Sequence, residues 1–243
     1  MKQFIYGKNT VYEVLKSNQE IYRIFLTESF KDGRIEKLLS KSNIKTIVTS
    51  KNGLNKLVGN VVHQNIVAEV KGYEYTVLED ILDNIHHDDP PLLVMLDGLE
   101  DPHNLGAILR TCDAIGVDGV ILGKNRSVGL SPTVAKVSTG AIDFVPVAQV
   151  TNLSRTLENL KKKGFWIIGC DLNNSSDYRS VDYNMPTVIV IGSEGQGISK
   201  LVKEKCDFNV ILPMTGHVQS LNASVATGII LYQVYQSRHP LKQ

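Results

Sequence analysis

The chain has 243 residues, of which 42% are hydrophobic and 21% are charged, and its net charge is +1. This composition is typical of a soluble globular protein that is long enough for two modest domains or one large one. No segment reaches the ~18 uninterrupted apolar residues of a transmembrane helix, and the start of the chain lacks a signal-peptide core. Cys112, Cys170 and Cys206 are odd in number and far apart, which argues against a disulfide framework or a zinc site. We therefore expect a cytoplasmic protein that holds no metal and inserts into no membrane.

The charges are unevenly distributed along the chain. Residues 1–72 carry a net charge of +6, residues 73–91 carry −6, and residues 92–243 carry +1. A basic first part is suited to binding a polyanion. A solvated lysine-rich surface explains the same charge equally well.

The first part of the chain predicts a small α/β unit. Helical spacing is expected after Gly7, around Val11 and Val14, and again around Ile35. Strands are predicted at 21–26, 44–48 and 66–70.

An acidic stretch that ends in Pro90-Pro91 follows this unit. Acidic residues before a double proline do not readily continue a helix or join a sheet. We therefore predict a linker at 73–91, between a first domain of residues 1–72 and a second of residues 92–243.

After Pro91 the pattern alternates between strand and helix. Strands are predicted at 92–97, 119–122, 144–148, 165–170, 188–191 and 209–212. Helices are predicted at 104–115, from Ser131-Pro132 onward, and at 152–163, 198–205 and 220–236. This alternation indicates a mostly parallel sheet covered on both faces, with ligands bound at the carboxyl ends of its strands.

A first polar loop at these strand ends leads into the helix that carries Asn104 and Arg110. Asn104 is expected to cap this helix. Arg110 lies among apolar neighbours, so it either extends to the surface or binds a phosphate or carboxylate.

The second and third loops follow the last two predicted strands, 188–191 and 209–212. The second, 192–197, has the spacing G-x-x-G-x-G, which differs from the dinucleotide fingerprint and from the triphosphate-binding loop. Taken alone, this glycine cluster favours a plain tight turn over a ligand site. In the third, Ser220 is expected to cap the last helix, whose amide donors, together with Asn222, would face a polar or anionic ligand.

Taken in order, these motifs resemble the SpoU group of RNA ribose 2′-O-methyltransferases, the TrmH-like branch of the SPOUT superfamily. The matching segments are Asn104-x-Gly106-Ala107-Ile108-x-Arg110-Thr111, Ile191-Gly192-x-Glu194-Gly195-x-Gly197, Leu212-Pro213-Met214 and Ser220-Leu221-Asn222-x-Ser224. The first part, with Tyr6-Gly7 and Val62-His63-Gln64, is similar to the substrate domain of the 23S rRNA guanosine-2′-O-methyltransferases.

This resemblance implies a fold and a reaction. The second domain would be an α/β fold with a mostly parallel sheet and a C-terminal trefoil knot, and the first a small α/β domain like ribosomal protein L30e. The protein would bind RNA as a homodimer and transfer a methyl group from S-adenosylmethionine to a ribose 2′-hydroxyl, most plausibly of a 23S rRNA guanosine. A tRNA target, a resistance-type rRNA site and a non-catalytic RNA-binding relative are the alternatives. A Rossmann-type enzyme is disfavoured by the glycine spacing.

The resemblance also implies site residues. The cofactor would be held by nine residues, namely Gly192, Gly195, Ile211, Leu212, Met214, Ser220, Leu221, Thr139 and Gly140. The catalytic roles would fall to Arg110, Asn104, Glu194, Ser220 and Asn222. Whether Arg110 acts in its own subunit or across the dimer stays open at this point.

Overall fold

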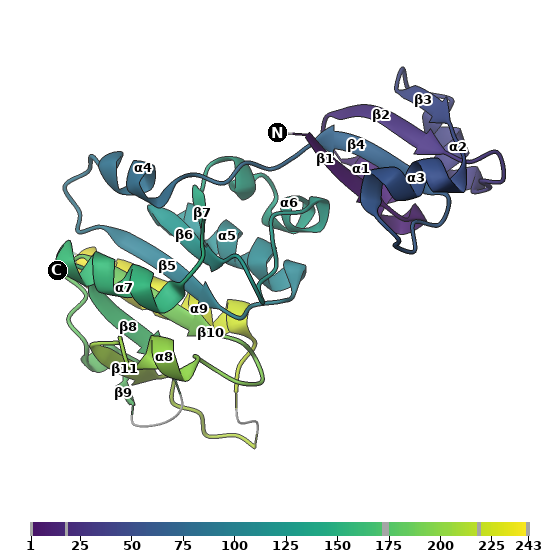
Figure 1. Cartoon of the computed structure of the whole chain (residues 1–243). Coiled ribbons are helices and arrows are strands. Elements are labelled where there is room, and N and C mark those ends of the chain that lie inside the picture. Colours follow the sequence, from purple (N-terminus) through teal and green to yellow (C-terminus); the bar gives the residue numbers. More distant parts are fainter. Residues whose placement is uncertain (1, 18, 172–174, 218–219, 242–243) are drawn as a thin grey trace. The chain divides into compact units, whose positions relative to one another are not determined.

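A computed structural model of the chain describes residues 2–17, 19–171, 175–217 and 220–241. The chain divides into two compact units, Met1–Glu74 and Tyr75–Gln243 (Figure 1).

The first unit is a four-stranded sheet with three helices. Its elements are β1 (Lys2–Tyr6), α1 (Lys8–Lys16), β2 (Ile21–Leu26), α2 (Gly33–Leu39), β3 (Lys45–Val48), α3 (Lys51–Val58) and β4 (Ile66–Lys71). The strands lie in the order β1-β4-β2-β3, and only the β2–β3 pair is parallel. The strands and the two helices expected here are confirmed. Sequence patterns missed β1 and α3.

The second unit contains a seven-stranded parallel sheet. Its strands are β5 (Leu92–Asp97), β6 (Gly119–Gly123), β7 (Val147–Val150), β8 (Trp166–Cys170), β9 (Ser176–Asp177), β10 (Thr187–Gly192) and β11 (Phe208–Ile211). Its helices are α4 (Leu78–Asp83), α5 (Pro102–Ile115), α6 (Pro132–Ser138), α7 (Leu153–Lys162), α8 (Lys200–Lys203) and α9 (Ala223–Arg238), with 3-10 turns at Ala141–Asp143 and Tyr178–Ser180. The strand order is β7-β6-β5-β10-β8-β11-β9, and every pair in the sheet is parallel. The predicted parallel sheet is confirmed.

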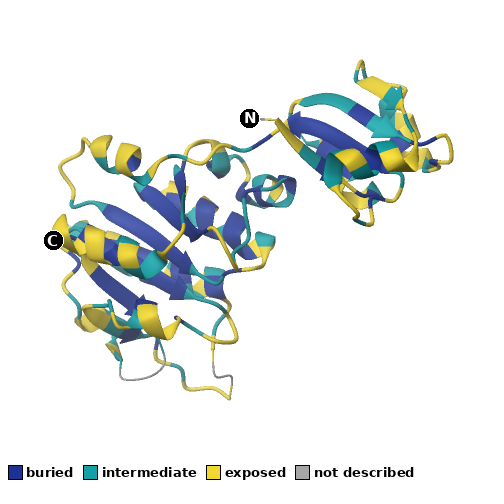
Figure 2. Ribbon diagram, viewed as in Figure 1, coloured by how far each residue is buried: buried dark blue, intermediate teal, exposed yellow. Residues whose placement is uncertain are grey.

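Helices cover both faces of this sheet, and buried residues concentrate in its central strands (Figure 2). Leu93 and Met95 of β5 pack in a cluster with Leu157 of α7 and Val202 of α8. Because side chains alternate along a strand, Leu96 points to the opposite face, where α5 packs against α6 and α9.

Close packing between α5 and α6 depends on a glycine. A Cβ on Gly106 would come within 2.6 Å of the Val137 side chain. A larger residue at this position would push the two helices apart.

Two predicted boundaries were wrong. The strand expected at 144–148 is Val147–Val150, because Ala141–Asp143 forms a 3-10 turn and Phe144 lies 78% exposed. The segment 73–91, expected as a linker, contains α4, which buries Ile81 in the core of the second unit. An acidic helix needs only one apolar face to pack, and the acidic composition of the segment hid that face.

None of the helices in the described ranges is long and apolar enough to cross a bilayer.

Arg238 connects the end of α9 by hydrogen bonds to two loops, one before β5 and one before β10. Its guanidinium donates to the carbonyl oxygens of Pro90 (2.6 Å), Tyr183 (3.0 Å) and Met185 (3.0 Å). These bonds hold the last helix, whose first turn belongs to the site described below.

Replacing Arg238 with methionine keeps the packing volume and removes all three hydrogen bonds. We expect Arg238→Met to lower the free energy of unfolding by about 2 kcal/mol, measured by urea denaturation, because charged donors to buried acceptors contribute strongly. Arg155→Met, at an exposed arginine of α7, is the control and should change this energy by less than about 0.5 kcal/mol. Equal losses in the two variants would contradict the role of Arg238.

Candidate active site

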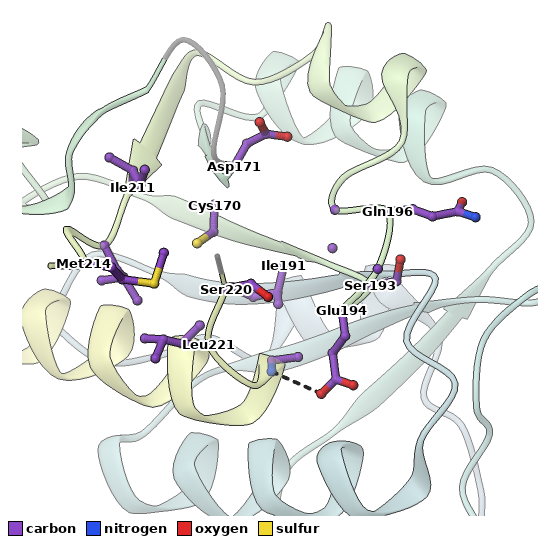
Figure 3. Close-up of a pocket in the computed structure, with 16 residues that line it drawn as sticks. Cys170, Asp171, Ile191, Ser193, Glu194, Gln196, Ile211, Met214, Ser220 and Leu221 are labelled. Carbon is purple, nitrogen blue, oxygen red and sulfur yellow. Dashed lines mark hydrogen bonds between the residues drawn. The ribbon is translucent and has the colours of Figure 1, made fainter. Parts of the chain in front are cut away.

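One pocket lies at the carboxyl ends of the central strands of the second unit (Figure 3). Its volume is about 360 Å³, which is within the usual range for small-molecule sites. Its walls come from the ends of β8, β10 and β11, from the two loops that follow β10 and β11, and from the first turn of α9. The lining residues are Cys170, Asp171, Ile191, Gly192, Ser193, Glu194, Gly195, Gln196, Gly197, Ile211, Leu212, Met214, Ser220, Leu221, Ala223 and Ala226.

The glycine loop after β10 folds back on itself. Ser193 and Gly197 exchange backbone hydrogen bonds of 3.1 and 2.9 Å, and Gly197 has a φ of +66°. A Cβ on Gly192 would lie 2.1 Å from the Gly197 backbone carbon, so only glycine fits there. Beyond the loop, the Asp97 carboxylate accepts the Ser199 amide at 2.7 Å. These contacts fix the loop as one wall of the pocket. A plain tight turn would not need the additional contact between Asp97 and Ser199.

Glu194 joins three segments that are distant in sequence. Its Oε1 accepts hydrogen bonds from Asn104 Nδ2 (2.7 Å), Asn222 Nδ2 (2.7 Å) and the Ala223 backbone amide (3.4 Å). Asn222 Nδ2 also donates to Asn104 Oδ1 at 2.9 Å. Asn104, Glu194 and Asn222, which we call the amide–carboxylate triad, thus fix the first turns of α5 and α9 against the glycine loop.

The cap of α9 is Asn222, and the prediction of Ser220 was wrong. Asn222 Oδ1 accepts from the backbone amides of Ser224 (2.9 Å) and Val225 (3.3 Å). Both residue types are good caps, but only Asn222 can also reach Glu194. Ser220 is left exposed at the pocket wall.

The cap of α5 is likewise displaced from the prediction. Asp101 accepts the His103 amide at 2.9 Å, and Pro102 occupies the first helical position. Asn104 therefore lies inside the first turn. Asn104 is 5% exposed, and its side chain donates to Glu194 instead of capping the helix.

The electrostatics of the pocket favour a neutral or cationic ligand. Two carboxylates, Glu194 and Asp171, line it, and no lysine or arginine does so among the described residues. Asp171 Oδ1 is held by Lys203 at 2.7 Å. Burial raises the pKa of the Cys170 thiol to about 11, so this group lines the pocket as a neutral surface and is no nucleophile.

Seven of the nine expected cofactor residues line this pocket; they are Gly192, Gly195, Ile211, Leu212, Met214, Ser220 and Leu221. Thr139 and Gly140 are not among its walls. They end α6 with φ values of +51° and +99°. Sequence reasoning missed Cys170, the last residue of β8, and Asp171, which follows it. Their position at a strand end was the available signal.

Arg110 stands apart from the triad. It is exposed on α5, lines no part of this pocket, and has no side-chain hydrogen bond or ion pair within the described residues. Six positions beyond Asn104, it lies on another side of the helix. Of the five expected catalytic residues, the structure brings together Asn104, Glu194 and Asn222, with Ser220 nearby, and leaves Arg110 outside.

Within the described part of the chain, no group of three or more His, Cys, Asp or Glu residues is placed to hold a metal ion.

Comparison with known proteins gives matches along almost the whole chain. The SpoU rRNA Methylase family matches residues 91–232, and a family described as RNA 2′-O ribose methyltransferase substrate binding matches residues 4–76. YacO of Bacillus subtilis (strain 168), assigned to the TrmH family of tRNA/rRNA methyltransferases, is 46% identical over 98% of this chain and 97% of its own length.

Two solved structures are also similar. An AdoMet-bound rRNA methyltransferase from Sinorhizobium meliloti has a TM-score of 0.65 and 25% identity, covering 99% of this chain and 88% of its own. The A. aeolicus TrmH/SpoU tRNA modifying enzyme has a TM-score of 0.57 and 35% identity, covering 66% and 82%.

Two glycine substitutions test the construction of the loop. Gly192→Ala should lower the melting temperature by several degrees, because its Cβ meets backbone that cannot rotate away. Gly195→Ala is the matched control. Its Cβ would meet no atom within 4 Å and its φ is not positive, so it should melt like the wild type. The loop geometry would be refuted by two variants of equal stability in a thermal scan.

Proposed function

The chain belongs to the SpoU rRNA methylase family of RNA 2′-O-ribose methyltransferases, and we propose that its pocket binds S-adenosylmethionine for methylation of a 23S rRNA guanosine. The observation that carries the proposal is a pocket of suitable size whose described walls contain backbone, apolar side chains and carboxylates but no cation. A phosphate-bearing ligand would be repelled there, whereas a neutral adenine with a sulfonium is accommodated.

The residues present fit this methyl donor. The backbone of Gly192, Leu212 and Leu221 would bind the neutral adenine, with Ile211 and Met214 as apolar surfaces beside it. Gly195 and Ser220 lie at the pocket wall, where the open space beside Gly195 lets a ligand approach the backbone. When bound, the donor supplies a methyl group already activated by its sulfonium.

In the reaction, the ribose 2′-oxygen forms a bond to the methyl carbon as the sulfur–carbon bond breaks, and the 2′-hydroxyl loses its proton. The protein must align the hydroxyl, assist loss of this proton and exclude water. Glu194 Oε1 is committed to three hydrogen bonds, so we assign the triad to positioning the loops and the target ribose. Ser220 would contact the substrate from the pocket wall.

We assign Arg110 to the reacting ribose of a partner subunit. It is an exposed cation on α5 with no hydrogen-bond or ion-pair partner among the described residues, and it does not line the pocket of its own chain. A guanidinium keeps its proton to a pH above about 12, so Arg110 would bind the adjacent phosphate and stabilise developing charge on the 2′-oxygen.

A dimer is supported by the surface of α9. Ile230, Leu231 and Val234 of this helix are buried in its own unit, yet a stripe of apolar residues on another side is exposed. This stripe consists of Val225 (50% exposed), Ile229 (38%) and Tyr232 (54%). Such a patch beside α5 is suited to a second copy of the chain.

The trefoil knot is a further part of the proposal. β10 lies between β5 and β8, and the chain then passes to β11, which lies between β8 and β9. It returns from there to place α9 against α5 and β10. This path is compatible with threading of the C-terminal segment, an exception to the usual absence of knots.

For the first unit we propose an L30e-like RNA-binding domain of residues 1–72. The net charge of +6 over these residues and the substrate-binding family match support it. The relatives are assigned to tRNA/rRNA methylation, so a tRNA or resistance-type target remains the second candidate.

Arg110→Ala is expected to fold and to bind S-adenosylmethionine with wild-type affinity in calorimetry. Its methyl transfer rate should fall by at least about a hundredfold, since it would lose stabilisation of developing charge. Arg155→Ala removes the same charge from α7 and serves as control. Near wild-type transfer by the Arg110 variant would rule out the assignment.

Deletion of residues 1–72 tests the role of the first unit. The truncated chain should bind S-adenosylmethionine as before, and its affinity for 23S rRNA fragments should drop by at least about tenfold at fixed salt, because phosphate contacts dominate RNA affinity. Anisotropy titration measures the affinity for RNA, and calorimetry measures the affinity for S-adenosylmethionine. An unchanged RNA affinity would contradict the proposal.

A further inference from the structure

The sheet of the first unit has two chemically different faces. On one face, Ile5 of β1, Ala68 of β4 and Ile24 of β2 are paired across the strands and pack in the apolar core with α1 and α2 residues. Strand alternation places every second residue on the opposite face.

This opposite face, which we call the outer face, carries aromatic and basic residues. The strand registers place Phe4, Glu69, Arg23 and Lys45 in one row across β1, β4, β2 and β3. The row on one side contains Tyr6, Val67, Phe25 and Ile47, and the row on the other contains Lys2 and Lys71.

Three aromatic side chains on this face remain accessible to a ligand. The Phe4 and Phe25 rings lie 6.3 Å apart at an angle of 56° and are both partly exposed. Tyr6 is 41% exposed. Val67, which lies between Tyr6 and Phe25 in the strand register, is fully buried, and α3 packs against β1 and β4, so the face is open around these rings and covered at Val67.

A buried carboxylate orients the cations beside these rings. The Glu69 side chain, only 3% exposed, pairs with Arg23 and with Lys2 at 3.5 Å. The Arg23 guanidinium lies 5.5 Å from the centroid of the Phe25 ring, and Lys2 Nζ lies 5.5 Å from that of Tyr22. Both cations keep substantial exposure, 40% for Arg23 and 63% for Lys2.

We propose that the outer face is a stacking platform for unpaired bases of the RNA substrate, an inference that rests on the proposed function. Bases stack on accessible aromatic rings and on arginine planes, while nearby lysines bind the phosphates. Four cations (Lys2, Arg23, Lys45 and Lys71) face one carboxylate here, which complements a polyanion.

A stacking platform of this kind gives the first unit a preference for single-stranded RNA. A duplex hides its bases, so it would meet the cations alone and gain nothing from the rings. The segment recognised is accordingly a loop, bulge or end of the RNA.

The test uses the full-length chain and fluorescence anisotropy with a 12-nucleotide single-stranded RNA and a duplex of equal length. Phe4→Leu combined with Phe25→Leu keeps apolar packing and removes the rings. It should weaken single-strand binding by at least about fivefold and leave duplex binding unchanged. Phe4→Tyr with Phe25→Tyr retains the rings and should bind like the wild type.

The contribution of the outer-face lysines to phosphate binding is tested by two matched pairs of lysine substitutions. Lys45→Ala with Lys71→Ala should reduce the slope of log affinity against log salt by about 1.4, since each phosphate contact on a single strand contributes ~0.7. Lys37→Ala with Lys41→Ala removes the same charge at α2 and should change the slope less.

The platform is overturned if the leucine variant binds single strands like the wild type, or if both lysine pairs act equally. A face that serves a protein partner instead would give the same two results. Calorimetry with S-adenosylmethionine on the same samples separates the two proposals. Failure of the wild type to bind the cofactor would refute the proposed function, whereas the RNA titrations alone decide the platform.

Discussion

The hydrogen bonds of one carboxylate oxygen hold the site together. Glu194 Oε1 receives donors from Asn104, Asn222 and Ala223, which belong to segments 90 and 28 residues away from it. The parallel sheet brings strand ends to one edge, but this alone leaves the loops free to move independently. The shared acceptor fixes α5, α9 and the glycine loop in one arrangement, and Gly192 permits the close backbone approach on which that arrangement depends. A pocket with mostly backbone and apolar walls follows from these two constraints.

In the proposed function, different parts of the chain bind the methyl donor and the RNA. The pocket would hold the methyl donor, and the described residues that line it include no lysine or arginine. Arg110 and the basic first unit would supply the positive charge instead. This separation suits the chemistry, because a cationic sulfonium and a polyanionic RNA need opposite electrostatic surroundings.

Apolar runs predicted most strands of both units, since burial on one or both faces leaves a direct trace in the sequence, but β1 and the two-residue β9 were missed and β7 was displaced. The residues that cap the helices were harder to predict. Asp101 and Asn104, like Ser220 and Asn222, are pairs of good capping residues a few positions apart, and the choice between them was made by tertiary contacts of Asn104 and Asn222 with Glu194. Asp171 was missed because its loop carries no glycine cluster. The proposed contact of Arg110 with the ribose of a partner subunit cannot be predicted from a pattern within one chain.

The central claim is that this chain methylates the 2′-oxygen of a ribose in RNA. The most direct measurement incubates the protein with a 23S rRNA transcript and S-adenosylmethionine carrying a radioactive methyl group, then hydrolyses the RNA with alkali. Cleavage by alkali requires a free 2′-hydroxyl, so our account predicts that the label is recovered in a dinucleotide resistant to hydrolysis, with guanosine as the methylated member. Label in mononucleotides would place the methyl group on a base and contradict the account, as would the absence of transfer to any rRNA or tRNA transcript.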